Sequence, residues 1–94
     1  MIEIETFSLR DGVDDHTFVM VDEDLQQRFA YQQPGLVRRT TARGEAGRWV
    51  VVTSWSSVDA ADAARAAAAQ STAVAAWMAL VNAGTVTLER YLPL

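Results

Sequence analysis

Residues 48–57, Arg-Trp-Val-Val-Val-Thr-Ser-Trp-Ser-Ser, are the stretch with the strongest β-strand character in this chain. Aromatic and β-branched residues dominate it, which is typical of a strand, and the run is too short to cross a membrane. Successive side chains on a strand point to opposite faces of the sheet. One face of this strand receives Trp49, Val51, Thr53 and Trp55, and the other receives Val50, Val52 and Ser54. Because both rows are largely apolar, we predict a central strand whose sheet is covered on both faces.

The length of the chain limits how that sheet is covered. At 94 residues the chain forms one domain, spanning residues 1–94, with a modest core. One layer of helices covers only one face of a sheet, so the second apolar face needs another chain. We therefore predict a homodimer that associates through its sheet faces.

Composition excludes several classes of partner. The net charge is -4, lysine is absent, and the arginines are scattered, so the clustered basic surface of a nucleic-acid-binding protein is missing. The alanine-rich residues 60–83 are interrupted too often by polar side chains to form a membrane span. We expect neither nucleic acid nor membrane among the partners.

The absence of cysteine excludes disulfides, thiolate catalysis and cysteine-ligated metals, and is compatible with a reducing compartment. The first residues lack the basic and then apolar regions of a signal peptide, so we expect a cytoplasmic protein. A single histidine, His16, has no companions with which to form a metal site, and no metal is expected.

The first half of the chain predicts a strand, a helix and a second strand. Residues 2–9 alternate and end at the turn Asp11-Gly12, and Asp14 or Asp15 caps a helix that stops before Pro34-Gly35. On this helix Phe18, Val21, Leu25 and Phe29 form an apolar stripe, and Asp22, Glu23, Gln26 and Gln27 lie on the other side. Residues 36–42 predict the second strand, with Val37, Arg39 and Thr41 on one face.

The second half repeats this order. A turn at residues 44–47 predicts a hairpin into the central strand, and Ser56 or Ser57 caps a second helix that runs from Val58 to Ala69. Residues 70–72 break this helix, and a short continuation carries Val74, Trp77, Met78 and Val81. Residues 85–92 form the last strand. The order β-α-β-β-α-β, with right-handed crossovers, predicts an α+β, ferredoxin-like fold with an antiparallel sheet.

Three segments of the chain are recognisable as a set: Leu9-Arg10-Asp11-Gly12, Gln33-Pro34-Gly35 and Thr53-Ser54-Trp55-Ser56-Ser57. Together they resemble the antibiotic biosynthesis monooxygenase-like group of the dimeric α/β-barrel superfamily. The resemblance covers nearly the whole length. It implies that two ferredoxin-like protomers pack their sheets into a dimeric α/β barrel, with a ligand cleft between helices and sheet in each protomer.

The resemblance also suggests two kinds of chemistry. Some members are oxygenases that need no cofactor and act on electron-rich polycyclic aromatics, and some relatives degrade haem. In both, a tryptophan at the end of the third strand lines the cleft, and Trp55 stands at that position. The other family positions do not match. The haem-degrading relatives have a histidine on the second helix, where this chain has Ala64, Arg65 and Ala66, and an asparagine on the first strand, roughly at Glu5. The polyketide oxygenases have a cleft tyrosine and asparagine where this chain has Ala61 and Val51.

Trp55 has two interpretations. Its ring either stacks on a flat aromatic ligand or fills the core of the barrel. Trp49 and Trp77 are predicted core residues, although the helix that carries Trp77 is positioned to cover the pocket. The residues predicted to bind the ligand are Phe7, Phe18, Val21, Leu25, Trp55, Ala64, Trp77 and Met78.

Two ionisable residues are candidates for general base. Glu5 on the first strand, if its row faces the cleft, is partly desolvated and has a raised pKa that suits it to take a phenolic proton. The alternative is an ion pair between Glu5 and Arg39 or Arg90 across the sheet. His16 is either a general base or a solvated residue beside the helix cap.

Two functional hypotheses therefore remain open. The first is a homodimer that binds a hydrophobic, aromatic small molecule and oxygenates it without a cofactor, with Glu5 as base and Trp55 as stacking platform. The second is a non-catalytic ligand-binding or structural dimer of the same fold. Motifs for hydrolase, kinase and nicotinamide chemistry are absent from the sequence.

Overall fold

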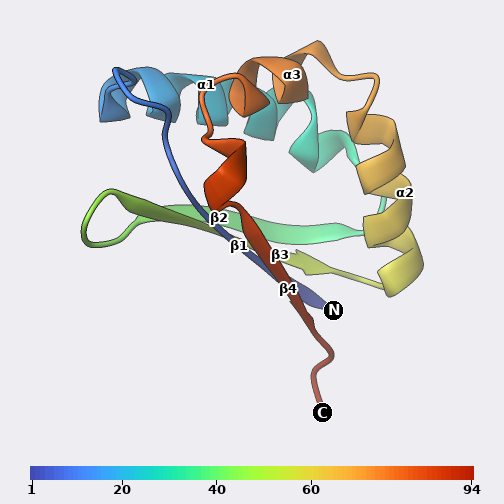
Figure 1. Ribbon diagram of the computed structural model, residues 1–94. Coiled ribbons are helices and arrows are strands. Elements are labelled where there is room, and N and C mark those ends of the chain that lie inside the picture. Colours follow the sequence, from blue (N-terminus) through green and yellow to red (C-terminus); the bar gives the residue numbers. More distant parts are fainter.

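The computed structural model describes all 94 residues and shows one four-stranded antiparallel sheet with helices on one face (Figure 1). The strands are β1 (Ile2–Ser8), β2 (Leu36–Arg43), β3 (Arg48–Trp55) and β4 (Thr87–Tyr91). The helices are α1 (Asp15–Arg28), α2 (Val58–Ala68) and α3 (Thr72–Met78), with short 3-10 helices η1 (Ala30–Gln32) and η2 (Ala83–Thr85). The strand order β2-β3-β1-β4 is ferredoxin-like, which confirms the predicted fold class.

The alternation predicted for β3 is confirmed. Trp49, Val51, Thr53 and Trp55 are buried beneath the helices, and Val50, Val52 and Ser54 on the other face are partly exposed. Strand pairing extends the buried row across the sheet, because Glu3 lies opposite Thr53 and Phe7 lies opposite Trp49. The helix-covered face therefore carries charged as well as apolar side chains.

Helix α1 begins where its cap predicts. The side chain of Asp14 accepts a hydrogen bond from the Thr17 amide at 2.8 Å. The prediction that Asp22 lies on the polar side of this helix is wrong, because Asp22 is buried beside Phe18 and Leu25. Positions 18, 22 and 25 share one side of a helix, and an arginine on the sheet, described below, neutralises the Asp22 carboxylate.

The predicted break between the second helix and its continuation is confirmed. Ser57 caps α2 by accepting a hydrogen bond from the Ala60 amide at 3.1 Å, and Ser71 caps α3 by accepting one from the Val74 amide at 3.2 Å. The break lets α3 lie beside α1 while α2 stands at the end of the sheet (Figure 1). Helix α3 ends at Met78, earlier than predicted.

One face prediction for β2 fails because the strand contains a bulge. Leu36 lies opposite Trp55 and Arg38 lies opposite Ser54, which leaves Val37 as an extra residue. Val37 is 65% exposed and does not share the buried face of Arg39.

The core consists of two clusters. Phe7, Phe18, Trp49 and Trp77 pack with tilted or edge-to-face rings whose centroids lie 4.8–5.8 Å apart. A smaller cluster joins Met1 and Trp55 to two alanines of α2. Residues of both clusters line the cavity described below.

The other face of the sheet carries no helix (Figure 1). Ile2, Ile4, Val50 and Val52 lie on neighbouring positions of this face and are partly exposed. Association through this face stays a prediction. No helix combines the length and apolar character needed to cross a bilayer.

Gly35, which precedes β2, packs closely against α2, whereas Gly12 has open space around it. Gly35 and Gly12 have nearly equal φ values, 85° and 86°. A Cβ at Gly35 would lie 2.5 Å from the Ala60 Cβ, whereas a Cβ at Gly12 meets nothing within 4 Å. We expect Gly12→Ala to cost about 1–2 kcal/mol of unfolding free energy from left-handed strain. Gly35→Ala should cost about 1–3 kcal/mol more from overpacking. Urea denaturation measures both, and equal losses would contradict the close packing of α2.

Candidate functional site

A cavity of about 630 Å³ lies between the sheet and the helices, within the size range of small-molecule sites. Its wall is mostly apolar and includes Leu25, Phe29, Val74, Trp77 and Met78. The charged side chains in the wall are Glu3, Glu5, Arg39 and Arg65. The cavity therefore combines a hydrophobic interior with a few ionisable groups.

The alanines of α2 explain why this space is not filled. Ala61, Ala64 and Ala68 recur at helical spacing and face the cavity. Alanine favours the helix and contributes only a methyl group, so α2 forms a wall without projecting into the space behind it. The sequence thus encodes a stable helix beside an open volume.

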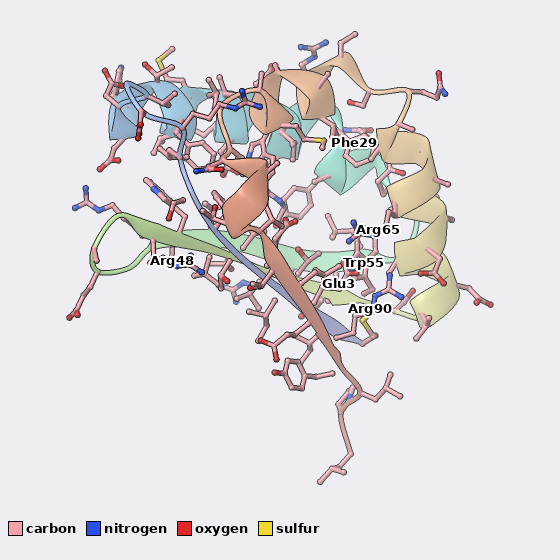
Figure 2. The ribbon with its side chains drawn as sticks, in the orientation of Figure 1. Glu3, Phe29, Arg48, Trp55, Arg65 and Arg90 are labelled. Atoms are coloured by element: carbon pink, nitrogen blue, oxygen red, sulfur yellow. The ribbon has the colours of Figure 1, made fainter.

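Trp55 is fixed at the base of the cavity by a carboxylate on β1. The Trp55 Nε1 donates to Glu3 Oε1 at 2.9 Å, and Arg90 Nε donates to Glu3 Oε2 at 2.9 Å. Arg65 Nη2 also donates to Glu3 Oε2, at the longer distance of 3.4 Å. Figure 2 shows Arg65 extending from α2 towards Trp55 and Glu3, with Arg90 beside them. These contacts hold the indole ring in one orientation and satisfy the buried Glu3 carboxylate.

A second ionic cluster includes Arg39 of the cavity wall. Arg39 Nη2 pairs with Asp22 Oδ1 at 2.8 Å, and Arg39 Nη1 donates to Gln26 and Thr41 at 3.2 Å each. The Trp77 Nε1 donates to Asp22 Oδ1 at 3.0 Å. Three of the five side-chain N–H donors of this buried arginine are therefore used within the protein.

Glu5 is different because it forms neither a hydrogen bond nor an ion pair through its carboxylate. The predicted alternative, an ion pair with Arg39 or Arg90, is absent, since those arginines bind Asp22 and Glu3 instead. Burial raises the pKa of Glu5 above its ordinary value of 4.5, while the charges of Arg65 and Arg39 partly oppose this effect. The cavity thus contains a carboxylate whose lone pairs have no protein partner.

The structure brings together most, but not all, of the residues predicted to bind a ligand. Leu25, Trp55, Ala64, Trp77 and Met78 line the cavity. Phe7, Phe18 and Val21 do not line it, because they pack in or against the aromatic core cluster, where Phe7 and Phe18 are fully buried. His16 is exposed near the start of α1 and lies outside the cavity wall.

Glu3 and Arg65 are the site residues that sequence reasoning did not assign. The alternation of β1 already placed Glu3 in the same row as Glu5, so a signal for Glu3 was present. In the sequence, Arg65 was notable only because it lies where the haem-degrading relatives have a histidine. No neighbouring residue indicated that its side chain contacts the sheet. No group of three or more histidine, cysteine or acidic side chains is arranged to hold a metal ion.

No protein-family model matches the sequence, and no curated protein matches it either. Among solved structures, a variant of SnoaB, a cofactor-independent oxygenase from Streptomyces nogalater, aligns with a TM-score of 0.78 and 22% identity over 98% of this chain and 90% of that one. SnoaB itself aligns with a TM-score of 0.76, 22% identity and coverage of 99% and 93%. A Chloroflexus aurantiacus protein described as a putative antibiotic biosynthesis monooxygenase aligns with a TM-score of 0.75 and 14% identity over 99% of this chain and 91% of that one.

This chain has the antibiotic biosynthesis monooxygenase fold. The resemblance inferred from the sequence is therefore confirmed at the level of fold, over nearly the entire length of the chain. At these identities the likeness establishes how the chain is folded, and the chemistry of its cavity has to be argued from its own side chains.

Glu3 and Glu5 differ in their partners, so replacing each with glutamine should change stability in opposite directions. Because burial raises the Glu5 pKa, the folded state binds the proton of the Glu5 carboxyl group more tightly than the unfolded chain does. The parent's stability therefore falls as the pH rises from about 4.5 through the raised pKa. We expect Glu5→Gln to be more stable than the parent at neutral pH, with the difference vanishing below that range.

The matched variant Glu3→Gln weakens the hydrogen bonds to Trp55 and Arg90 and should lose roughly 1.5–3 kcal/mol at neutral pH. Urea denaturation across pH 4 to 8 measures both variants, with about one pH unit between points to resolve the change. A loss of stability in Glu5→Gln at neutral pH would show that Glu5 has a partner.

Proposed function

We propose that the protein is a homodimer that binds a hydrophobic aromatic phenol in this cavity and oxygenates it without a cofactor. The observation that carries the proposal is the unpaired Glu5 carboxylate in an apolar cavity whose wall includes the fixed Trp55 ring. The fold shared with a cofactor-independent oxygenase supports the same choice. The cytoplasmic location predicted from the sequence is part of this proposal.

Glu5 begins the proposed reaction by accepting the phenolic proton. A base is most effective when its pKa lies near the working pH, and burial raises the pKa of Glu5 in that direction. The resulting electron-rich anion transfers an electron to dioxygen, and the two radicals combine to form a ring-carbon peroxide. The peroxide then loses water to give a quinone, so one oxygen atom enters the product and the other leaves as water.

The rest of the site positions the ring and excludes water. Trp55 presents a flat apolar face, and its bond to Glu3 prevents the indole from rotating away from a stacked ligand. The apolar wall keeps the deprotonated ring out of bulk water, which favours transfer of an electron over return of the proton. Positioning in this way lowers the barrier without a dedicated redox group.

Oxygen uptake with a panel of naphthols and anthrols tests this function. Trp55→Ala should lower uptake strongly while circular dichroism shows a retained fold, because the stacking surface is lost. Glu5→Gln should lower the catalytic rate about 10²–10⁴-fold, the usual contribution of a general base. Trp55→Phe keeps a ring at the platform and should retain more activity than Trp55→Ala. A parent protein that consumes no oxygen with any member of the panel counts against the proposal.

A non-catalytic ligand carrier is the second candidate, and the largely apolar wall favours it. A carrier needs the cavity and the Trp55 platform, but it does not need Glu5 to exchange protons. Quenching of tryptophan fluorescence by naphthols, without oxygen uptake, would identify the carrier. Equal affinity of the parent and Glu5→Gln for a naphthol methyl ether would support it further, since the ether has no proton to donate.

The homodimer has its own test, because the apolar row of Ile2, Ile4, Val50 and Val52 has no cover within the chain. We expect the parent to sediment as a dimer at micromolar concentration and Val52→Arg to sediment as a folded monomer, since a charge would be buried without a partner. Val37→Arg is the matched control, because Val37 is 65% exposed at the β2 bulge. A well-folded parent monomer at micromolar concentration would contradict the proposed association.

A further inference from the structure

The four charged side chains of the cavity wall divide into committed and uncommitted groups. Glu3 accepts hydrogen bonds from Trp55, Arg90 and Arg65, and Arg39 is committed to the cluster around Asp22. Glu5 has no partner. Arg65 has a single contact, at 3.4 Å, to a carboxylate oxygen that Arg90 approaches more closely, at 2.9 Å.

Arg65 therefore has most of its hydrogen-bonding capacity free. An arginine has five N–H donors, and only one of those of Arg65 is used within the protein. Its side chain is 55% exposed, yet it lines the cavity from α2 among alanines that offer no competing acceptor. Arg39, the other cation of the wall, uses three of its donors in the cluster around Asp22, so Arg65 is the cation of the wall with the most donors available to a ligand.

Arg65 and Glu5 line the same cavity, and the nearby charge of Arg65 lowers the pKa of Glu5 against the larger rise that burial causes. Glu3 and Glu5 lie two residues apart on the same face of β1, roughly 6.5–7 Å from one Cα to the other. Arg65 already reaches Glu3, and it forms no ion pair with Glu5. An oxygen that makes charged hydrogen bonds of about 2.8 Å to two groups spans about 5.6 Å between them. An oxygen bound at that spacing would accept from the Arg65 guanidinium and donate to the Glu5 carboxylate.

We propose that Arg65 is a catalytic residue that donates a hydrogen bond to the same phenolic oxygen whose proton Glu5 accepts. The proton passes from that oxygen to the Glu5 carboxylate, and the negative charge left on the oxygen stays beside the guanidinium. This inference rests on the proposed function, to which it adds a defined ligand group, an acidic aromatic hydroxyl held between an acceptor and a cationic donor.

The charges of the site favour a hydroxyl over other polar groups. Proton transfer from a hydroxyl to Glu5 leaves the net charge of the site unchanged. A ligand carboxylate would bring another negative charge close to Glu3 and Glu5, and a ligand amine would place a positive charge close to Arg65. A neutral hydroxyl both donates to Glu5 and accepts from Arg65, so it satisfies both groups at once.

The ionisation of a bound reporter phenol tests Arg65 without requiring turnover. The probe is 4-nitro-1-naphthol, whose phenolate absorbs visible light while the phenol does not, titrated with pH in complex with each variant. An adjacent opposite charge lowers the pKa of an acid, so the bound probe should ionise at least about one pH unit higher in Arg65→Gln than in the parent. Glu5→Gln removes a neighbouring negative charge and should shift the probe in the opposite direction.

The matched control is Arg28→Gln, which removes the same charge from an arginine of similar exposure on α1, outside the cavity wall. It should leave the ionisation of the probe unchanged. Arg65→Lys keeps the charge and should recover part of the shift. Circular dichroism confirms the fold of each variant, and Arg65 contributes only one long hydrogen bond to it.

The outcomes separate this inference from the proposed function. An unchanged probe pKa in Arg65→Gln, with binding retained, overturns the role of Arg65 even if the parent oxygenates naphthols. An Arg65-dependent shift in a parent that consumes no oxygen supports the shared hydroxyl site, and it overturns the oxygenase together with the catalytic role of Arg65. A probe that fails to bind the parent overturns the inference, because no site for an acidic aromatic hydroxyl is then present.

Discussion

A carboxylate buried on a sheet needs hydrogen-bond donors, and Glu3 accepts hydrogen bonds from Trp55, Arg90 and Arg65. Its contacts with Trp55 and Arg90 hold the tryptophan ring still and tie β1, β3 and β4 together at one end of the sheet. Glu5, two residues along the same strand, has no such partners. Of these two glutamates, Glu3 is bonded within the protein, and Glu5 is left with an unpaired carboxylate in the cavity wall. This difference is what makes the face a candidate site.

The cavity depends on a difference in side-chain size between the two ends of the helix-covered face. Large aromatic rings pack one end of the helix-covered face, and alanines of α2 leave room at the other. Helix propensity allows α2 to form without bulky residues, and the break before Ser71 lets α3 follow a different direction beside α1. The open volume therefore follows from helix composition and from a capped break between helices.

Periodic patterns and caps predicted the fold because they are local. The alternation of β3 and the serine caps of α2 and α3 are set by neighbouring residues, and the structure confirms them. The buried position of Asp22 and the bulge at Val37 depend instead on partners distant in sequence, Arg39 for the first and the register with β3 for the second. The same reason explains Arg65, whose contact with Glu3 joins residues 62 positions apart.

Strand β3 separates the two surfaces on which the proposed function depends. Its inward residues, among them Val51, Thr53 and Trp55, line the cavity, and its outward residues form part of the open face. Because side chains alternate, a substitution on the open face does not remove an atom from the cavity wall. Association and ligand chemistry can therefore be perturbed separately. An effect of the open face on the cavity would have to travel through the backbone of β3, which is bonded on both sides to neighbouring strands.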